Sequence, residues 1–279
     1  MKQLSILILS VLSLSFLFLN CGPANYQLQF RQIDEKLNEK KLAEAENLCR
    51  EIIKNDSQNS EAYLYLGKIL LEKNDLTDAF TNFKKSRSLK KSPDVIFQLA
   101  NINCKLGNLT TAKAYLDSLG GVSQGQNEYS KLLGDILSAK ASADSAYDAG
   151  IEFYSADKYY SALMSFKCSG ELNKENRENE YYRNMAEGLY LYYKKGVDSY
   201  WDAIIAFGKA AVLKPEQGEP HYLMGICYEK KDKDDFDNTI SEYRKALELE
   251  MTDDYREKAA SRLKNQTERK KKLDAFWGR

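Results

Sequence analysis

The sequence is poor in histidine and proline and has no net charge. It contains one histidine and four prolines in 279 residues, and its 41 basic residues balance 41 acidic ones. The single histidine, His221, argues against multi-histidine metal sites and histidine-based triads, and neither an HExxH nor a GxSxG motif is present. A neutral chain also lacks the basic footprint of nucleic-acid binding. We therefore expect no catalytic residue, no metal, no cofactor and no nucleic-acid partner, and we predict that the protein is not an enzyme.

Cysteine is scarce and unpaired in the sequence. None of the five cysteines belongs to a CxxC motif, so neither a redox pair nor a zinc site is indicated. Four of them fall within expected helices, and we predict that these are small buried thiols. They are Cys49, Cys104, Cys168 and Cys227.

Only one long apolar run is present, from Leu4 to Leu19. It has no charged residue, follows Lys2 and is shorter than the ~20 residues of a spanning helix, which is typical of a secretory signal. The run ends in Phe18-Leu19-Asn20-Cys21, which resembles the lipobox of bacterial lipoproteins. The resemblance implies cleavage before Cys21, acylation of this cysteine and a lipid-anchored protein of the bacterial cell envelope, in the outer membrane and facing the periplasm.

Two alternatives exist for this N-terminal segment. One is ordinary secretory cleavage after Ala24, and the other is an uncleaved membrane anchor. Acylation at Cys21 fits the local chemistry better, because each buried lipid CH₂ contributes ~0.8 kcal/mol and several chains together bind the membrane firmly.

Internal repetition is the strongest signal in the rest of the chain. Residues 64–89 align without a gap on residues 147–172, with Gly67 matching Gly150 and Phe83 matching Phe166. Small residues at fixed positions, apolar residues three or four apart and a polar turn between them predict two antiparallel helices that cross closely.

The pattern recurs six times. An alanine is expected to open the second helix of each pair, and these positions are Ala45, Ala79, Ala112, Ala162 and Ala203, with Thr239 in the last pair. Four residues later stand Cys49, Phe83, Leu116, Phe166, Phe207 and Tyr243. This spacing resembles the tetratricopeptide repeat, which implies an all-α superhelical solenoid of antiparallel helix pairs. Ile33 replaces the expected glycine in the first repeat, and Gly188 is taken as the glycine of the fifth.

The spacing of these residues suggests two modules. Successive positions are 34, 33, 50, 41 and 36 residues apart, so the third interval exceeds one repeat by about the length of one helix. The predicted organisation is a signal peptide (1–20), a lipidated tether (21–25), a first module (26–126), a linking or capping helix (127–142), a second module (143–251) and a C-terminal capping helix with a basic tail (252–279).

In the tetratricopeptide family the first helices of the pairs line a concave groove that binds proteins or peptides. Carried over by position, the groove of the second module is rich in tyrosine, a residue that supplies contact area at low entropic cost. The predicted partner-binding residues are Tyr147, Tyr154, Tyr182, Tyr192, Tyr193 and Tyr222. The alternative for each tyrosine is that it only packs between repeats.

Two functions remain open for such a scaffold. Its architecture and anchor resemble tetratricopeptide lipoproteins of outer-membrane barrel assembly and of type IV pilus secretin assembly. The alternative is an adaptor that recruits or regulates an envelope enzyme acting on peptidoglycan. The C-terminal basic run, residues 269–272, is followed by Phe276 and Trp277, and is expected to be a solvated helix face or a contact with anionic lipid.

Overall fold

The structure, a computed structural model, describes residues 26–120, 126–194 and 196–278. The apolar run and Cys21 therefore lie outside the described residues. Within the described ranges the chain forms thirteen helices, and the only β pairing there is one isolated bridge between Gln217 and Glu250. No helix in these ranges is both long and apolar enough to cross a bilayer.

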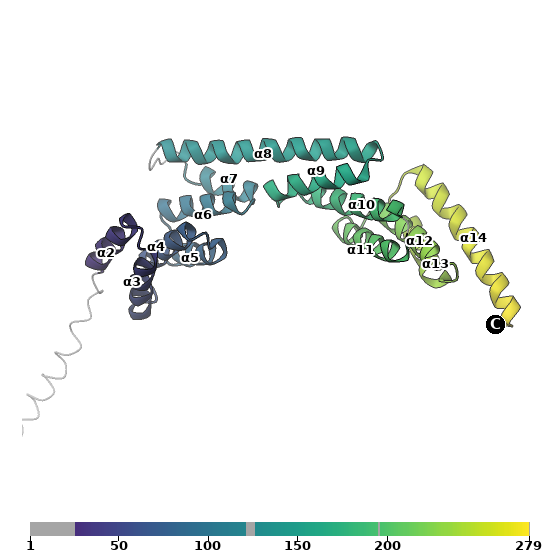
Figure 1. Ribbon diagram of the computed structural model, residues 1–279, viewed down its shortest axis with the longest axis horizontal. Coiled ribbons are helices and arrows are strands. Elements are labelled where there is room, and N and C mark those ends of the chain that lie inside the picture. The colour runs from purple at the N-terminus through teal and green to yellow at the C-terminus, as the bar shows by residue number, and fades with distance from the viewer. Residues whose placement is uncertain (1–25, 121–125, 195, 279) are drawn as a thin grey trace, which may run out of the picture. The chain divides into compact units, whose positions relative to one another are not determined.

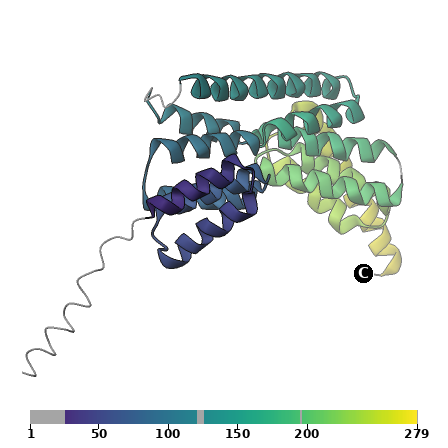
Figure 2. The same cartoon turned by 60° about the vertical axis from the view of Figure 1, so that its left-hand side comes forward.

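The chain divides into two compact units, residues 1–102 and 103–279 (Figures 1 and 2). Unit 1 contains α2 (Gln27–Asn38), α3 (Leu42–Asn55), α4 (Ser60–Glu72), α5 (Leu76–Leu89) and most of α6 (Pro93–Lys105). Unit 2 contains the end of α6, α7 (Leu109–Asp117), α8 (Gln126–Ser155), α9 (Tyr159–Leu172), α10 (Arg177–Lys194), α11 (Val197–Leu213), α12 (Glu219–Lys231), α13 (Phe236–Glu248) and α14 (Asp253–Trp277).

Consecutive helices pack against one another in both units. In unit 1 this packing runs from α2 to α5, and in unit 2 it runs from α7 to α14. Each helix buries an apolar stripe on its neighbours, because a single pair cannot cover its own apolar face. The predicted all-α fold of antiparallel helix pairs is confirmed.

The helices of a pair cross where a glycine faces an aromatic ring. The pairs are Gly67 with Phe83, Gly150 with Phe166, Gly188 with Phe207 and Gly225 with Tyr243. A methyl group on Gly67 would lie only 2.5 Å from Cε1 of Phe83, so no larger residue fits without displacing the ring. The four aromatic side chains are fully buried. The predicted repeat register is confirmed, including the use of Gly188 in the fifth repeat.

In the first repeat the large and the small residue of the helix crossing exchange places. Ile33 occupies the glycine position and Cys49 occupies the aromatic position, and both are completely buried. A large residue on the first helix is thus combined with a small one on the second, which conserves core volume.

The turns inside the first four pairs share one backbone feature. Lys40, Asn74, Gly107 and Asp157 adopt left-handed φ values of 57°, 61°, 79° and 58°, and each precedes the alanine of its second helix by five residues. Among these, only Gly107 adopts this conformation without steric cost. In the sixth pair no residue of the turn 232–235 has a positive φ. Asp235 caps α13 there by accepting a 3.3 Å hydrogen bond from the Asn238 backbone N–H.

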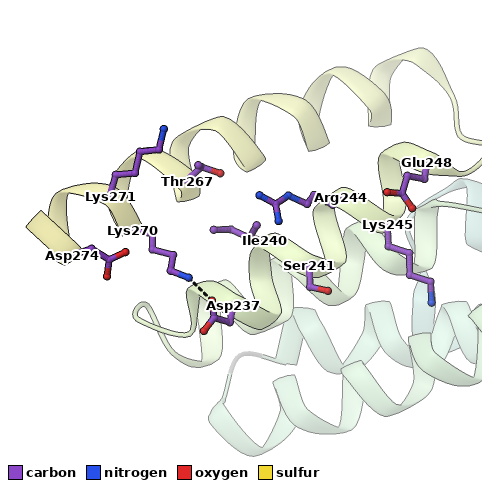
Figure 3. Close-up of a pocket in the computed structure, with 10 residues that line it drawn as sticks. All are labelled: Asp237, Ile240, Ser241, Arg244, Lys245, Glu248, Thr267, Lys270, Lys271 and Asp274. Carbon is purple, nitrogen blue, oxygen red and sulfur yellow. Dashed lines mark hydrogen bonds and ion pairs between the residues drawn. The ribbon is translucent and has the colours of Figure 1, made fainter. Parts of the chain in front are cut away.

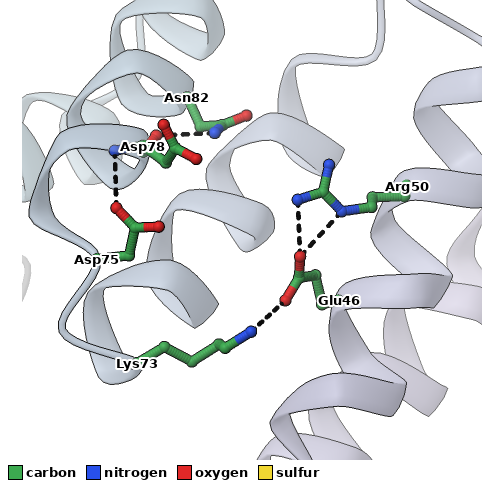
Figure 4. A network of polar contacts seen from close by, with 6 residues as sticks. All are labelled: Glu46, Arg50, Lys73, Asp75, Asp78 and Asn82. Atoms are coloured by element: carbon green, nitrogen blue, oxygen red, sulfur yellow. Dashed lines mark hydrogen bonds and ion pairs between the residues drawn. The ribbon is translucent and has the colours of Figure 1, made fainter.

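Neighbouring pairs in unit 1 are joined by a polar network around Glu46 of α3 (Figure 4). The Glu46 carboxylate accepts hydrogen bonds from Arg50 one turn later and, at 2.7 Å, from Lys73 at the end of α4. These donors, Lys73 before Arg50, lower the pKa of Glu46. Beside them, Asp75 caps α5 by accepting from the Asp78 N–H at 3.2 Å.

The segment between the predicted modules is part of one long helix. Helix α8 covers 30 residues without a break, so the linking helix and the first helix of the fourth repeat are continuous (Figures 1 and 2). Leu132, Ile136 and Ala143 form its buried stripe. The spacing of four and seven residues places them on one face. Helix α7 is one of the helices that pack against α8.

The cysteines differ in burial. Cys49 and Cys227 are buried, and burial raises the pKa of each thiol to about 12. Cys104 is half-buried, and burial also raises its pKa. The prediction of a buried thiol is wrong for Cys168, which is exposed. Cys168 lies six residues after its repeat alanine, whereas Cys49 lies four after its own, so the two occupy different helix faces.

Candidate functional site

The predicted groove tyrosines lie on the first helices of three consecutive pairs. Helix α8 carries Tyr147 and Tyr154, which are seven residues apart and therefore on the same face two turns apart. Helix α10 carries Tyr182, Tyr192 and Tyr193, and it packs against α8. The remaining tyrosine, at position 222, is on α12.

Tyr182 is the centre of the ring contacts in this region. Its ring centroid lies 5.6 Å from that of Tyr154 and 6.3 Å from that of Tyr147, both in edge-to-face arrangements. This geometry is favourable because the positive edge of one ring meets the negative face of the next. Lys214, the C-cap residue of α11, lies 5.5 Å from the Tyr182 ring centroid and 2.7 Å from a Glu178 carboxylate oxygen.

Tyr159, at the start of α9, connects these rings to the end of α10. Its ring lies 5.7 Å from Tyr154 and stacks on Tyr193 at 5.5 Å with an interplanar angle of 10°. Tyr193 in turn contacts Tyr192 at 5.1 Å. Five of the six predicted tyrosines thus belong to one contact network, which we call the tyrosine cluster: Tyr147, Tyr154, Tyr159, Tyr182, Tyr192 and Tyr193.

Tyr222 lies apart from this cluster. Its side chain is buried, and its ring contacts Tyr243 of α13 at 6.0 Å and Tyr255 of α14 at 5.4 Å. In this structure Tyr222 packs between the last three helices. Tyr193 is the most exposed residue of the tyrosine cluster, with an exposed fraction of 58%.

An open pocket of about 580 Å³ adjoins the tyrosine cluster. We call it the tyrosine pocket, and it is lined by Asp157, Lys158, Tyr159, Tyr160, Ser161, Tyr190 and Tyr193. Tyr160 is 56% exposed and contacts Tyr190 at 5.3 Å, so the two rings form a second aromatic pair beside the stacked pair of Tyr159 and Tyr193. The pocket therefore combines four aromatic rings with one carboxylate and one ammonium group.

Sequence reasoning missed Tyr159, Tyr160 and Tyr190. The first two begin the second helix of a pair, and only first-helix positions were expected to face a partner. A usable signal was present: two adjacent tyrosines directly follow the turn at Asp157, and Tyr190 and Tyr193 are three residues apart on one helix face.

The hydroxyl groups of Tyr147, Tyr154, Tyr159 and Tyr192 remain protonated at neutral pH, because their pKa values are raised. Burial raises the pKa of Tyr147 to about 12, with a smaller contribution from nearby Glu178. Burial, followed by the hydrogen bond that its hydroxyl donates to Asp157, also raises the pKa of Tyr159. These four tyrosines therefore combine apolar ring faces with neutral hydroxyl groups.

No group of three histidine, cysteine, aspartate or glutamate side chains in the described ranges is placed to bind a metal ion. His221 is buried and pairs with Glu242, its Nδ1 lying 2.7 Å from Oε2. This contact joins α12 to α13 and gives the histidine a structural role.

The fold defines an all-α repeat protein of antiparallel helix pairs with tetratricopeptide spacing. No protein-family model matches the sequence, and no curated protein matches it significantly. Solved structures with a similar fold are tetratricopeptide (TPR) proteins. The TPR domain of P58(IPK) is 17% identical, with 90% of this chain and 67% of that chain covered and a TM-score of 0.49.

Two further structures have the same kind of repeat. YrrB, described as a TPR protein with an unusual peptide-binding site, is 15% identical over 76% of this chain and 97% of its own, with a TM-score of 0.33. The TPR2AB domain of yeast Sti1, solved as a pHSP90 complex, is 12% identical over 89% of this chain and 96% of its own, with a TM-score of 0.34.

Proposed function

We propose that the chain is a non-enzymatic protein-interaction scaffold that binds an extended segment of a partner protein at the tyrosine pocket. The observation that carries this proposal is the open pocket with four tyrosine rings on rigid helices of unit 2. Tyrosine is frequent at binding hot spots because it buries a large area while fixing few rotatable bonds.

The pocket suits a peptide better than a charged ligand. Its two aromatic pairs offer apolar faces for side chains such as proline or leucine, while the hydroxyls and Ser161 can bond to backbone groups. One carboxylate and one ammonium group, from Asp157 and Lys158, leave the rim neutral. The whole chain is neutral as well, which gives no basis for nucleic-acid binding.

The tyrosine cluster beneath the pocket preorganises it. Tyr159 and Tyr193 are held by contacts to Tyr154 and Tyr192, so their rings are ordered before a partner arrives. Preorganised rings lose less rotamer freedom on binding, and more of the contact energy appears as affinity.

We further propose that the protein is lipid-anchored at Cys21 in a bacterial envelope, on the periplasmic face of the outer membrane. The support is the uncharged run from Leu4 to Leu19 ending in a lipobox-like sequence. Changing Cys21 to serine should release the protein to the soluble fraction or leave unprocessed precursor. A processed Cys21→Ser protein that stays in the membrane fraction would show the lipoprotein assignment to be wrong.

Photo-crosslinking in cells tests the binding role. A photoreactive amino acid is placed at Tyr193 in one strain and, as a matched control, at Leu137 in another; Leu137 is an exposed apolar residue on the same unit, on α8. We expect a defined adduct at position 193 that is missing at position 137. Equal adducts at both positions, or none at position 193, would contradict the proposal.

The identity of the adduct separates the two envelope roles. Subunits of an outer-membrane barrel or secretin would support a role in assembly. A peptidoglycan hydrolase would instead support the adaptor role. Both outcomes require the same tyrosine pocket.

A further inference from the structure

The last turns of α14 carry two adjacent aromatic side chains that pack against little of the protein. Phe276 is 77% exposed and Trp277 is 64% exposed, and their ring centroids lie 5.1 Å apart in an edge-to-face contact. In both views the end of α14 extends beyond the other helices of unit 2 (Figures 1 and 2).

The first half of α14 is fixed to the repeat body. Ala259 and Gln266 are buried, and Arg262 donates a 3.0 Å hydrogen bond to Glu229 of α12. Tyr255 packs on Tyr222 of the same helix. The helix is therefore a docked element rather than a loose tail, and its end has a defined position.

The second half of α14 lies along α13, and a charged cleft of about 600 Å³ separates the two helices (Figure 3). There Lys270 points down from α14 and forms an ion pair with Asp237. Arg269 lies over the Phe236 ring, 5.4 Å from its centroid. Lys271 also lines this cleft, but its side chain points away from Asp237 (Figure 3).

The end of α14 carries a net positive charge. Between residues 264 and 278 there are five basic and two acidic residues, in a chain whose net charge is zero. Lys271 and Lys272 are exposed, and neither forms an ion pair with any residue in the described ranges. Exposed lysines thus stand four to six residues before an exposed aromatic pair on one rigid helix.

We propose that this end of α14 docks on an anionic membrane surface, with Phe276 and Trp277 at headgroup level and Lys271 and Lys272 against lipid phosphates. Aromatic rings favour the bilayer interface, and lysines near it are attracted by anionic lipids. This inference is independent of the peptide-binding role of the tyrosine pocket.

A second copy of the chain is a poorer occupant. A symmetric contact would place the same patch against itself, so that Lys271 and Lys272 of both copies would approach one another. Cores of protein interfaces are also depleted in lysine. An anionic bilayer attracts the lysines and also accommodates the aromatic rings at its interface.

Tryptophan fluorescence tests the proposal in the full chain, because the sequence has only two tryptophans. The Trp201→Phe variant leaves Trp277 as the sole reporter. It is reconstituted into vesicles of brominated phosphatidylglycerol and phosphatidylethanolamine, and separately into brominated phosphatidylcholine alone. We expect a blue shift and quenching of Trp277 in the anionic vesicles and little of either in the neutral ones.

Two variants provide the controls. Trp277→Phe leaves Trp201, a partly exposed residue of α11 beside Lys231, which should stay unquenched in both vesicles. Adding Lys271→Glu and Lys272→Glu to the Trp201→Phe variant should reduce quenching to the neutral-lipid value. Each lysine near an anionic surface changes the docking equilibrium about fivefold, so losing both changes it by about thirtyfold. Positions 201, 271, 272 and 277 are all exposed, and an unchanged melting temperature verifies that each variant is folded.

Several results would overturn the proposal. Trp277 that is quenched no more than Trp201 in anionic vesicles would show that the helix end stays in water. Trp277 quenching that is equal in anionic and neutral vesicles, or that is unchanged by the two lysine substitutions, would rule out the anionic surface as the partner. A monomer–dimer equilibrium abolished by Trp277→Phe, without lipid quenching, would assign the patch to a second copy.

Discussion

Replacing Gly150 with alanine tests the helix crossing on which the repeat register depends. The new methyl group would lie 2.5 Å from Cε1 and 2.6 Å from Cδ1 of Phe166, where contacting carbons are normally about 3.5–4.0 Å apart. The Phe166 ring has no space to retreat, because it is fully buried and packs against Tyr147 and Tyr182 at 5.8 and 6.0 Å.

The same helix contains a matched control. Gly134 of α8 is exposed, and a methyl group there would meet nothing within 4 Å. Alanine is favoured over glycine in a helix interior by about 1 kcal/mol at both positions, so Gly134→Ala should stabilise the protein. Overpacking a core costs about 1–3 kcal/mol. The Gly150→Ala protein should be less stable than the Gly134→Ala protein by an amount near the upper end of this range.

Urea unfolding followed by far-ultraviolet circular dichroism measures this difference. Adding Phe166→Leu to Gly150→Ala should recover part of the loss, because the shorter side chain makes room for the methyl group; leucine occupies the equivalent position, Leu116, in the third repeat. The loss of stability in the double variant should therefore be smaller than the sum of the losses in the two single variants. A Gly150→Ala protein as stable as Gly134→Ala would refute the crossing.

Two other predictions follow from charge and burial. Glu46→Gln should lower stability by about 1 kcal/mol at neutral pH. Because the pKa of Glu46 is lowered in the folded state, its contribution is complete above the unfolded value of about 4.3 and is lost as the pH falls through the folded-state pKa. The stability gap between wild type and variant should therefore narrow as the pH falls below about 4.3 in urea unfolding. A stability gap that stays constant on acidification until the wild type itself unfolds would contradict this linkage. A thiol reagent, with labelled peptides located by mass spectrometry, should modify Cys168 in the native protein but Cys49 and Cys227 only after unfolding; fast native labelling of Cys49 would contradict its burial.

The helix pairs were predictable because their determinants are local and repeated. Gly67 and Phe83 lie sixteen residues apart in one hairpin, and their size complementarity recurs as Gly150 with Phe166. The exchange of Ile33 with Cys49 was visible as a departure, although only the structure shows that both side chains are fully buried. Local patterns of this kind specify which residues cross, since each pair is a separate supersecondary unit.

The tyrosine pocket was harder to predict because it depends on contacts between separate pairs. Tyr159 stacks on Tyr193, 34 residues away on another helix, and the repeat pattern contains no position for that contact. Tyr222 is covered by Tyr255, whose position depends on how α14 docks after the last repeat. Neither arrangement follows from helix periodicity alone.

The central claim, that the tyrosine pocket binds a partner segment, is tested most directly by measuring affinity for the segment located by crosslinking at position 193. Changing Tyr160 and Tyr193 together to alanine should weaken binding by about thirtyfold or more, equivalent to about 2 kcal/mol. Leu137→Ala, which removes a comparable exposed side chain elsewhere on unit 2, should leave affinity unchanged. Both variants should melt like wild type. Wild-type affinity in the folded Tyr160→Ala, Tyr193→Ala protein would contradict the claim.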